Sequence, residues 1–405
     1  MHRPESLAFP PGFLWGAATA GHQTEGNNVN SDYWQREYAA GTTVPEPSGD
    51  ACDSYHRYRE DIALLADTGL DTYRFSLEWS RIEPEPGVFS RAEMDHYRRM
   101  VDACHEAGLT PMVTLNHFTV PRWMHADGWW RAPRAAELFA RFTEAVLPVV
   151  REGVPWVCTI NEPNIIACGA GAEEGGANLV AHGLARPSRR VSEELVRAHQ
   201  LSREVLTAEG IKSGWSVATQ AIHAEPGCEE EARAYSYPLE EFFLEAARGD
   251  DFVGVQAYTR TFVGREGALP PREDVEKTLT GWEYFPAALG FGVRNAWEVT
   301  GHVPVIVTEN GIATADDDRR VDYTAEALAH LHQAIADGVT VHGYLHWSAL
   351  DNYEWGRYAP TFGLIAVDRS TFARTVKPSA YWLGQVARAN ALPAPSSPVL
   401  TEGAA

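Results

Sequence analysis

Long hydrophobic runs are absent from this 405-residue sequence. No stretch approaches the 18 or so apolar residues that a membrane-spanning helix needs. The N-terminal segment MHRPESLAFPPGFLWG also lacks the long apolar core of a secretory signal. We therefore expect no membrane partner, and we expect the protein to act in the cytoplasm.

Cysteine is scarce and scattered. The five cysteines form neither a Cys-x-x-Cys pair nor a cluster with histidine, and they are Cys52, Cys104, Cys158, Cys168 and Cys228. This pattern argues against a disulfide framework and against a zinc site, and it fits a reducing compartment. We expect no metal and no other cofactor.

Positive charge is in deficit. The chain has 34 Lys and Arg against 55 Asp and Glu, a formal net charge of −21, and no Lys/Arg run. Nucleic acids and anionic membranes both require clustered cations, so neither is an expected partner. The sequence leaves the oligomeric state open, and a homo-oligomer is compatible with it.

Aromatic residues are plentiful, with 13 Trp, 15 Tyr and 15 Phe, and many lie next to polar residues. Such rings suit a sugar or another flat polar ligand, although core filling is the simpler interpretation of any single ring. The 44% hydrophobic and 22% charged residues are typical of a soluble globular protein.

Apolar strand-like runs alternate with amphipathic helical stretches. Eight runs are found: FLWGAATA, TYRFSLEWS, TPMVTLNHF, WVCTINEP, SGWSVATQ, DFVGVQAYT, VPVIVTENG and VHGYLHWSALDN. Continuous apolar runs are typical of parallel strands buried on both faces. Eight βα units predict an α/β protein with a closed (β/α)8 barrel.

The helices that follow these runs are expected at residues 53–67, 90–107, 133–151, 192–209, 229–247, 285–299, 323–337 and 377–389. A bare barrel needs about 250 residues, so the surplus is expected in loops at 27–51, 165–191 and 261–283. Residues 1–390 would form one catalytic barrel, and the Pro/Ala/Ser-rich segment 391–405 a flexible tail. An open, doubly wound sheet is the alternative, but the first strand leads into GHQTEGNN instead of a glycine-rich phosphate turn.

Polar residues recur where the predicted strands end. In a barrel these ends share one face, where catalytic groups lie. The residues are Gln23, Glu25, Arg74, Glu78, Asn116, His117, Asn161, Glu162, Gln256, Tyr258, Glu309, Asn310, Trp347, Asp351, Asn352, Glu354 and Trp355.

Glu162 and Glu309 stand out because each ends an apolar strand beside an asparagine. Their strands, the fourth and the seventh, lie three apart in a ring of eight, so we expect the two side chains to face each other across the mouth. A lone strand-end Glu is more often a cap or an ion-pair partner. A pair flanking a small cavity is typical of retaining glycoside hydrolysis, with the carboxyl groups about 5–5.5 Å apart.

Two neighbouring residues have open interpretations. Arg74 is the strand cation available to keep one carboxylate ionised, or it forms a structural ion pair. His117 is expected to form hydrogen bonds instead of binding a metal, because no second ligand lies at a suitable spacing.

Taken together, several motifs resemble those of glycoside hydrolase family 1, the β-glucosidase family. They are FPPGFLWGAATAGHQTEG, YRFSLEWSRIEPEPG, TINEP, VTENG, GYLHWSALDNYEW and FGLIAVD, in this order, and the resemblance runs from Phe9 to about Ala387. Any one motif alone would be weak, but the ordered set is highly specific.

The resemblance implies a retaining exo-β-glycosidase that acts on small β-glucosides, β-galactosides or β-fucosides. It implies Glu162 as the general acid/base and Glu309 as the nucleophile. Arg74, Tyr258 and Asn310 would support the nucleophile. The substrate-binding residues would be Gln23, His117, Asn161, Gln256, Trp282, Trp347, Glu354 and Trp355.

Some positions depart from the family pattern. Phe118 stands where Trp is usual, Gln256–Ala257 where Asn-Tyr is usual, and the segment after TINEPN is short. A transglycosylase on the same site therefore stays an alternative, as does a non-catalytic sugar-binding protein, although both carboxylates are present. A 6-phospho-β-glycosidase is disfavoured because Glu354 would repel a phosphate and no lysine follows before Lys377.

Overall fold

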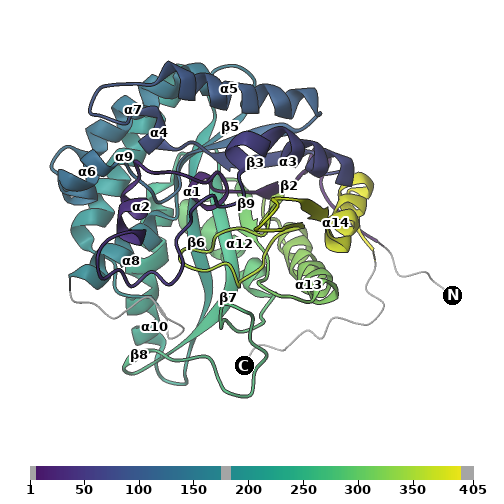
Figure 1. Ribbon diagram of the computed structural model, residues 1–405. Helices are drawn as coiled ribbons and strands as arrows, with labels where there is room; N and C mark the ends of the chain where they lie inside the picture. The colour runs from purple at the N-terminus through teal and green to yellow at the C-terminus, as the bar shows by residue number, and fades with distance from the viewer. Residues whose placement is uncertain (1–5, 175–183, 394–405) are drawn as a thin grey trace.

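The computed structural model describes residues 6–174 and 184–393. Eight strands lie parallel in a closed ring: β2 (Leu14–Ala18), β3 (Thr72–Ser76), β4 (Thr110–Asn116), β5 (Trp156–Asn161), β6 (Ser213–Ala224), β7 (Val253–Gly264), β9 (Val305–Asn310) and β10 (Val341–Trp347). The pairing of β6 with β7 closes the ring (Figure 1). The predicted (β/α)8 barrel is confirmed.

Helices cover the outside of the barrel (Figure 1). They are α3 (Ser54–Thr68), α5 (Arg91–Glu106), α7 (Ala135–Val150), α9 (Arg189–Ala208), α10 (Glu229–Ser236), α11 (Phe242–Ala246), α12 (Ala288–Thr300), α13 (Asp317–Ala336) and α14 (Pro378–Ala389). The sequence sets some of their ends: the side chain of Ser90 accepts a hydrogen bond from the Glu93 amide at the start of α5.

The strands are apolar because both of their faces are covered. The main hydrophobic core lies between the ring and the helices and includes Val305 and Val307 of β9. Between these residues, Ile306 points the other way and joins Met112, Cys158 and Leu345 of other strands in a separate cluster inside the barrel. The interior of the barrel is therefore filled with packed side chains and is not an open pore.

Short elements fill the connections. They are α1 (Gly21–Thr24), α2 (Asp32–Glu37), α4 (Trp79–Ile82), α6 (Arg122–Ala126), α8 (Pro163–Glu173), β8 (Gly267–Ala268), β11 (Ile365–Val367), β12 (Arg374–Val376) and the 3-10 turn Trp129–Arg131. The helix expected at 229–247 is divided by the π-helical turn Tyr237–Glu241. Pro238 has no amide hydrogen to donate, which accounts for the interrupted helical ladder.

Strands β6 and β7 are longer than expected. They stay paired as far as Ala224 and Val263, with an irregularity between Thr219 and Ala221. A loop was predicted at 261–283, but β7 continues to Gly264 and then pairs with β8. The two strands project toward β8, beyond the ends of their neighbours (Figure 1), and form a wall on one side of the barrel mouth.

The predicted boundary at residue 390 also needs correction. Ala391 and Leu392 form β13, which pairs antiparallel with β1 (Leu7–Ala8), so the ordered chain continues past the predicted start of the tail. The rest of the predicted tail, 394–405, and the part of the predicted loop at 175–183 lie outside the described residues. Among the described helices, none is both long enough and apolar enough to cross a membrane.

Candidate active site

The C-terminal ends of the barrel strands open into a cavity of about 540 Å³. Most of the predicted site residues line it: Gln23, His117, Glu162, Gln256, Tyr258, Trp282, Glu309, Trp347, Glu354 and Trp355. Of the remaining predicted residues, Arg74 and Asn161 lie directly behind this lining and bond to it. The barrel therefore brings residues that are distant in sequence to one place.

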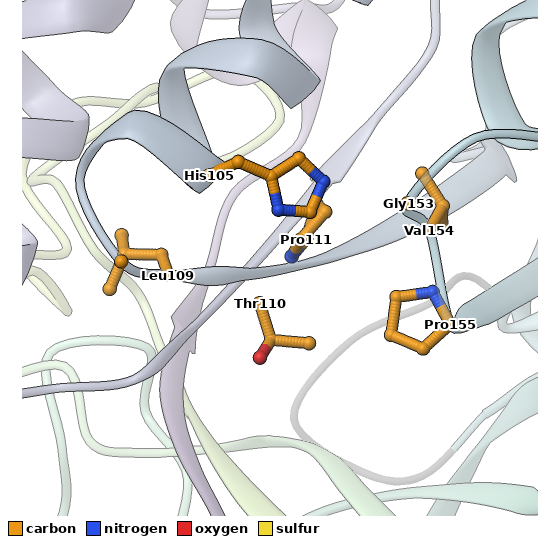
Figure 2. Close-up of a pocket in the computed structure, with 8 residues that line it drawn as sticks. His105, Leu109, Thr110, Pro111, Gly153, Val154 and Pro155 are labelled. Atoms are coloured by element: carbon orange, nitrogen blue, oxygen red, sulfur yellow. The ribbon is translucent and has the colours of Figure 1, made fainter.

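A second cavity, of about 500 Å³, lies at the opposite end of two strands. It is lined by the segment from Gly108 to Pro111, where β4 begins, by the segment from Gly153 to Pro155, just before β5, and by His105 (Figure 2). It contains no carboxylate, so it lacks the groups expected for glycoside hydrolysis.

Glu309 is held by two donors. It is 4% exposed at the end of β9. Arg74 Nη1 donates to its Oε1 at 2.7 Å and the Tyr258 hydroxyl donates to its Oε2 at 2.7 Å. Burial raises the pKa of Glu309, while the charge of Arg74 and the hydroxyl of Tyr258 oppose that rise.

Arg74 links several strands beneath the cavity. Its side chain is fully buried, and its Nε donates to Thr114 Oγ1 at 2.9 Å while its Nη2 donates to Asn161 Oδ1 at 2.5 Å. The predicted ion pair exists, and its partner is Glu309 itself. The cation is thus fixed where it favours the charged form of that carboxylate.

Glu162 has different surroundings. It follows β5 in a left-handed conformation, φ 46° and ψ 59°, directly before Pro163, which begins α8. Its amide donates to the Ser216 carbonyl at 2.8 Å, but within the described chain its carboxyl group has no hydrogen-bond partner. Desolvation first, and then the charge of Glu309, raise the pKa of Glu162 well above its usual range.

The orientation of the Asn161 amide is fixed by its partners. Oδ1 accepts from Arg74, which can only donate, and from Gln256 Nε2 at 2.8 Å. Nδ2 therefore faces His117 Nε2, at 3.2 Å, and this nitrogen must be the acceptor. The proton of His117 then lies on Nδ1, which is buried without a protein partner in the described structure.

Burial and the nearby charge of Arg74 hold the pKa of His117 well below its usual range, so the ring is neutral. Its Nδ1–H is a free donor that a ligand oxygen can accept from. The Oε1 atoms of Gln23 and Gln256 are likewise buried without a partner in the described residues. The floor of the cavity thus offers unused donors and acceptors.

Glu354 lies beside Gln23 in the lining of the cavity. It accepts from Trp347 Nε1 at 3.2 Å and from Gln23 Nε2 at 3.3 Å. Desolvation raises its pKa to about 8. The neutral form of this carboxyl group is therefore favoured more than in a solvent-exposed glutamate.

Trp355 and Trp282 frame the cavity. Trp355 stacks on His117 with ring centroids 6.2 Å apart and planes 15° apart. Trp282 lies 5.5 Å from the Tyr258 ring, further out along the cavity. The floor is thus bordered by flat aromatic surfaces.

Several of the polar strand-end residues have their partners outside the cavity, among them Asn310, Glu25 and Glu78. Asn310, expected to support the nucleophile, donates to the Ala257 carbonyl at 2.6 Å, and no hydrogen bond of the described residues joins it to the Glu309 carboxylate. Glu25 pairs with Arg81 at 2.8 Å, and Glu78 accepts hydrogen bonds from neighbouring loops.

Sequence reasoning placed Asn352 at a strand end without giving it a role in the site, and it missed the residues that line the outer cavity. Asn352 accepts from Gln23 Nε2 at 3.0 Å and so positions it. The outer cavity is lined by residues of the long β6 and β7 strands and the segment that follows, including Gln220, Arg260, Phe262, Leu269 and Glu283. A continued alternation of residues beyond Tyr258 was the available signal, but polar residues and a bulge obscured it.

In residues 6–174 and 184–393, no group of three or more His, Cys, Asp and Glu side chains is arranged so that it could hold a metal ion.

Comparison with known proteins agrees with this geometry. A family model for glycosyl hydrolase family 1 matches residues 5–232 and 247–392. The β-glucosidase A of Thermotoga maritima is 31% identical over 451 aligned positions, covering 95% of this chain and 98% of that protein. A bifunctional β-D-glucosidase/β-D-fucosidase of Bifidobacterium breve is 29% identical, covering 93% and 97%.

Solved structures give the same result. The crystal structure of the β-glycosidase BGL167 is 45% identical, with a TM-score of 0.88 over 96% of this chain and all of that one. A β-glycosidase from Pyrococcus horikoshii is 32% identical, with a TM-score of 0.86 over 96% of each chain.

Proposed function

The chain belongs to glycosyl hydrolase family 1, and from this membership we propose that Glu309 is the nucleophile and Glu162 the general acid/base of a retaining β-glycosidase. The observation that supports this assignment is the unequal hydrogen bonding of the two carboxyl groups. Glu309 has two donors that favour its charged form, whereas the Glu162 carboxyl has none in the described chain.

In the first step, a Glu309 oxygen attacks the anomeric carbon and forms a glycosyl ester. The bond from that carbon to the leaving oxygen breaks, and Glu162 gives its proton to the leaving oxygen, so an alcohol departs. The raised pKa of Glu162 keeps this proton available near neutral pH.

In the second step, Glu162 has become a carboxylate. It takes a proton from a water molecule as the water oxygen attacks the anomeric carbon from the side that the alcohol left. The ester bond breaks and Glu309 is released as a carboxylate, again stabilised by Arg74 and Tyr258. Two inversions leave the sugar in its original β configuration.

The sugar would bind on the polar floor of the cavity. His117 would donate its free Nδ1–H, Asn161 would bind the hydroxyl next to the anomeric carbon, and Gln256 would lie beside them. Gln23 and Glu354 would bind the hydroxyls at the far side, with Trp347 and Trp355 against the ring. A β-glucoside or β-fucoside is the proposed substrate class, after the names of the relatives.

Action in a reducing compartment such as the cytoplasm is part of the proposal. It is supported by the five cysteines, all of which lie in the described chain, are buried and are free thiols. Homo-oligomerisation stays a prediction, and so does the treatment of residues 1–390 as one catalytic unit.

Covalent labelling tests the two roles. A 2-deoxy-2-fluoro-β-glucoside with a good leaving group should form a slowly hydrolysed ester, and mass spectrometry of the digested protein should locate it on Glu309. The Glu309→Gln variant should acquire no label and should lose about 10⁴-fold or more of its turnover of an aryl β-glucoside. A label on Glu162, or a variant with nearly unchanged turnover, would contradict the assignment.

A further inference from the structure

The cavity has an outer part that the proposed mechanism does not use. We propose that this outer part binds an apolar leaving group, an alkyl or aryl alcohol, in preference to a second sugar. The inference rests on the proposed function, because it places the scissile bond between Glu162 and Glu309.

One side of the outer part is the wall formed by β7 and β8. Beyond Tyr258, this wall presents Phe262 to the cavity, and the chain then returns with Leu269, Pro270 and Pro271. The Leu269 amide donates to the Phe262 carbonyl at 2.8 Å, so the returning segment is fixed against the strand. Leu269 lines the cavity and is 36% exposed, so its side chain is accessible to a ligand there.

The other sides are also apolar. Ile165 of α8 lines the cavity close to Glu162. Phe118 lies against Trp355, with ring centroids 5.0 Å apart, and Trp282 lies against Phe362 at 6.3 Å. A leaving group that passes between these side chains would be surrounded by carbon on several sides.

The polar groups of the outer part are largely occupied by one another. Arg260 donates Nε and Nη2 to Glu283 Oε1 at 3.1 and 2.6 Å. The Thr259 hydroxyl donates to the Glu283 carbonyl at 2.9 Å, and the Thr261 hydroxyl donates to Gln220. A second sugar would have to compete for these atoms, whereas an apolar group leaves every one of these bonds intact.

The charges of the outer part are balanced. Arg260 and Glu283 form an ion pair, and the Arg260 guanidinium also lies 4.2 Å from the centre of the Phe285 ring. An anionic leaving group would therefore find no free cation among the described lining residues. A neutral, apolar leaving group is therefore the kind that fits the outer part of the cavity.

The test uses the whole enzyme and a series of n-alkyl β-glucosides from methyl to octyl, with cellobiose as the sugar competitor. Each buried methylene should raise kcat/KM by about twofold to fourfold until the chain outgrows the cavity. The octyl compound should therefore exceed cellobiose by at least about tenfold. A flat alkyl series, or a preference for cellobiose, would overturn the proposal.

Two leucine variants provide a matched comparison. Leu269→Asn places an amide in the cavity wall and should lower kcat/KM for the octyl compound about tenfold while leaving the methyl compound unchanged. Leu279→Asn alters a leucine that is 51% exposed and does not line the cavity, and it should change neither. Equal losses on the methyl and octyl compounds in Leu269→Asn would contradict an aglycone role for the wall.

Calorimetry separates this inference from the catalytic assignment. Non-hydrolysable methyl and octyl 1-thio-β-glucosides should differ in affinity in the same direction as the substrates. If the aryl glucoside is not hydrolysed but the octyl thioglucoside binds more tightly than the methyl one, the catalytic assignment fails and the aglycone inference stands. Equal affinities would overturn the aglycone inference alone.

Discussion

The ends of β5 and β9 carry the same two residue types in opposite order, Asn161–Glu162 and Glu309–Asn310. On β9 the glutamate is the penultimate residue of the strand and receives two hydrogen bonds. On β5 the strand ends with the asparagine, and Glu162 follows in a left-handed turn without a side-chain partner. A shift of two residues relative to the strand end, from one residue before it to one residue after it, therefore gives two identical acids different environments.

The difference matters because the two groups interact. Each is raised in pKa by burial, and the charge of Glu309 raises the pKa of Glu162 further. Arg74 and Tyr258 act most directly on Glu309, so the first proton to leave the pair should leave from there. The observable pKa values belong to the pair, and they should appear as the two limbs of a bell-shaped pH profile.

Among substitutions that leave Glu309 in place, Glu162→Gln should have the largest effect, because it removes the proton donor of the pair and leaves only the ionised Glu309. The variant has no proton to give, so kcat/KM for an alkyl β-glucoside should fall by about 10²–10⁴-fold. A dinitrophenyl β-glucoside needs no protonation of its leaving group, so its first step should lose far less. In the wild-type enzyme, deprotonation of Glu162 ends activity at high pH. The variant lacks this group, so the basic limb of the pH profile should disappear. Stopped-flow and steady-state rates on both substrates check this, and equal losses would contradict the acid role.

Arg74→Met should have the next largest effect, a loss of about 10²–10³-fold in kcat/KM. Activity requires ionised Glu309, and removing the cation raises its pKa, so the acid limb should move to higher pH. The basic limb should move in the same direction but less, since Arg74 also lowers the pKa of Glu162.

A matched control for this change is Arg374→Met. Arg374 forms a buried pair with Asp61 at 2.7 Å, away from the cavity lining. Its loss should lower the midpoint of thermal unfolding and leave both pH limbs unchanged. If the two variants gave the same pH profile, Arg74 would be acting only through stability.

Tyr258→Phe should have the smallest effect of the three. One charge-assisted hydrogen bond to Glu309 is removed, which corresponds to about 10–100-fold in kcat/KM. Because that bond favours the ionised form, the acid limb should move to higher pH by less than in Arg74→Met. Tyr97→Phe is the control, since Tyr97 is buried and bonds Glu25 at 3.0 Å behind the site. An unchanged acid limb in Tyr258→Phe would exclude a role in holding the nucleophile.

The barrel could be predicted from the sequence because its strands are buried on both faces. Runs such as Val305–Val307 have no polar residue to obscure them, and each is followed by a helix with one apolar face. The strand-end side chains could be predicted to converge for the same reason: parallel strands in a ring end on one face. Thus Glu162 and Glu309 could be placed in one cavity without coordinates.

The outer cavity could not be predicted, because the sequence of its strands changes from apolar to mixed polar and apolar along their length. Beyond Tyr258, β7 reads Thr-Arg-Thr-Phe, which resembles a loop as much as a strand. Its pairing with β6 depends on a bulge, which shifts the alternation of side chains. Asn310 illustrates a second limit: its place beside the nucleophile was visible, but its side-chain direction depends on partners such as Tyr344, 34 residues away.

The projection of β6 and β7 beyond their neighbours separates two tasks in space. The outer wall of the cavity is built on the extended ends of β6 and β7. Glu162, Glu309 and Arg74 instead lie on or directly after the strands of the ring. Insertions, deletions and substitutions in these extended ends can therefore accumulate without disturbing the ring. If the outer cavity binds the leaving group as proposed, substitutions confined to the extended parts of β6 and β7 should change which alcohols are released while the ring stays the same.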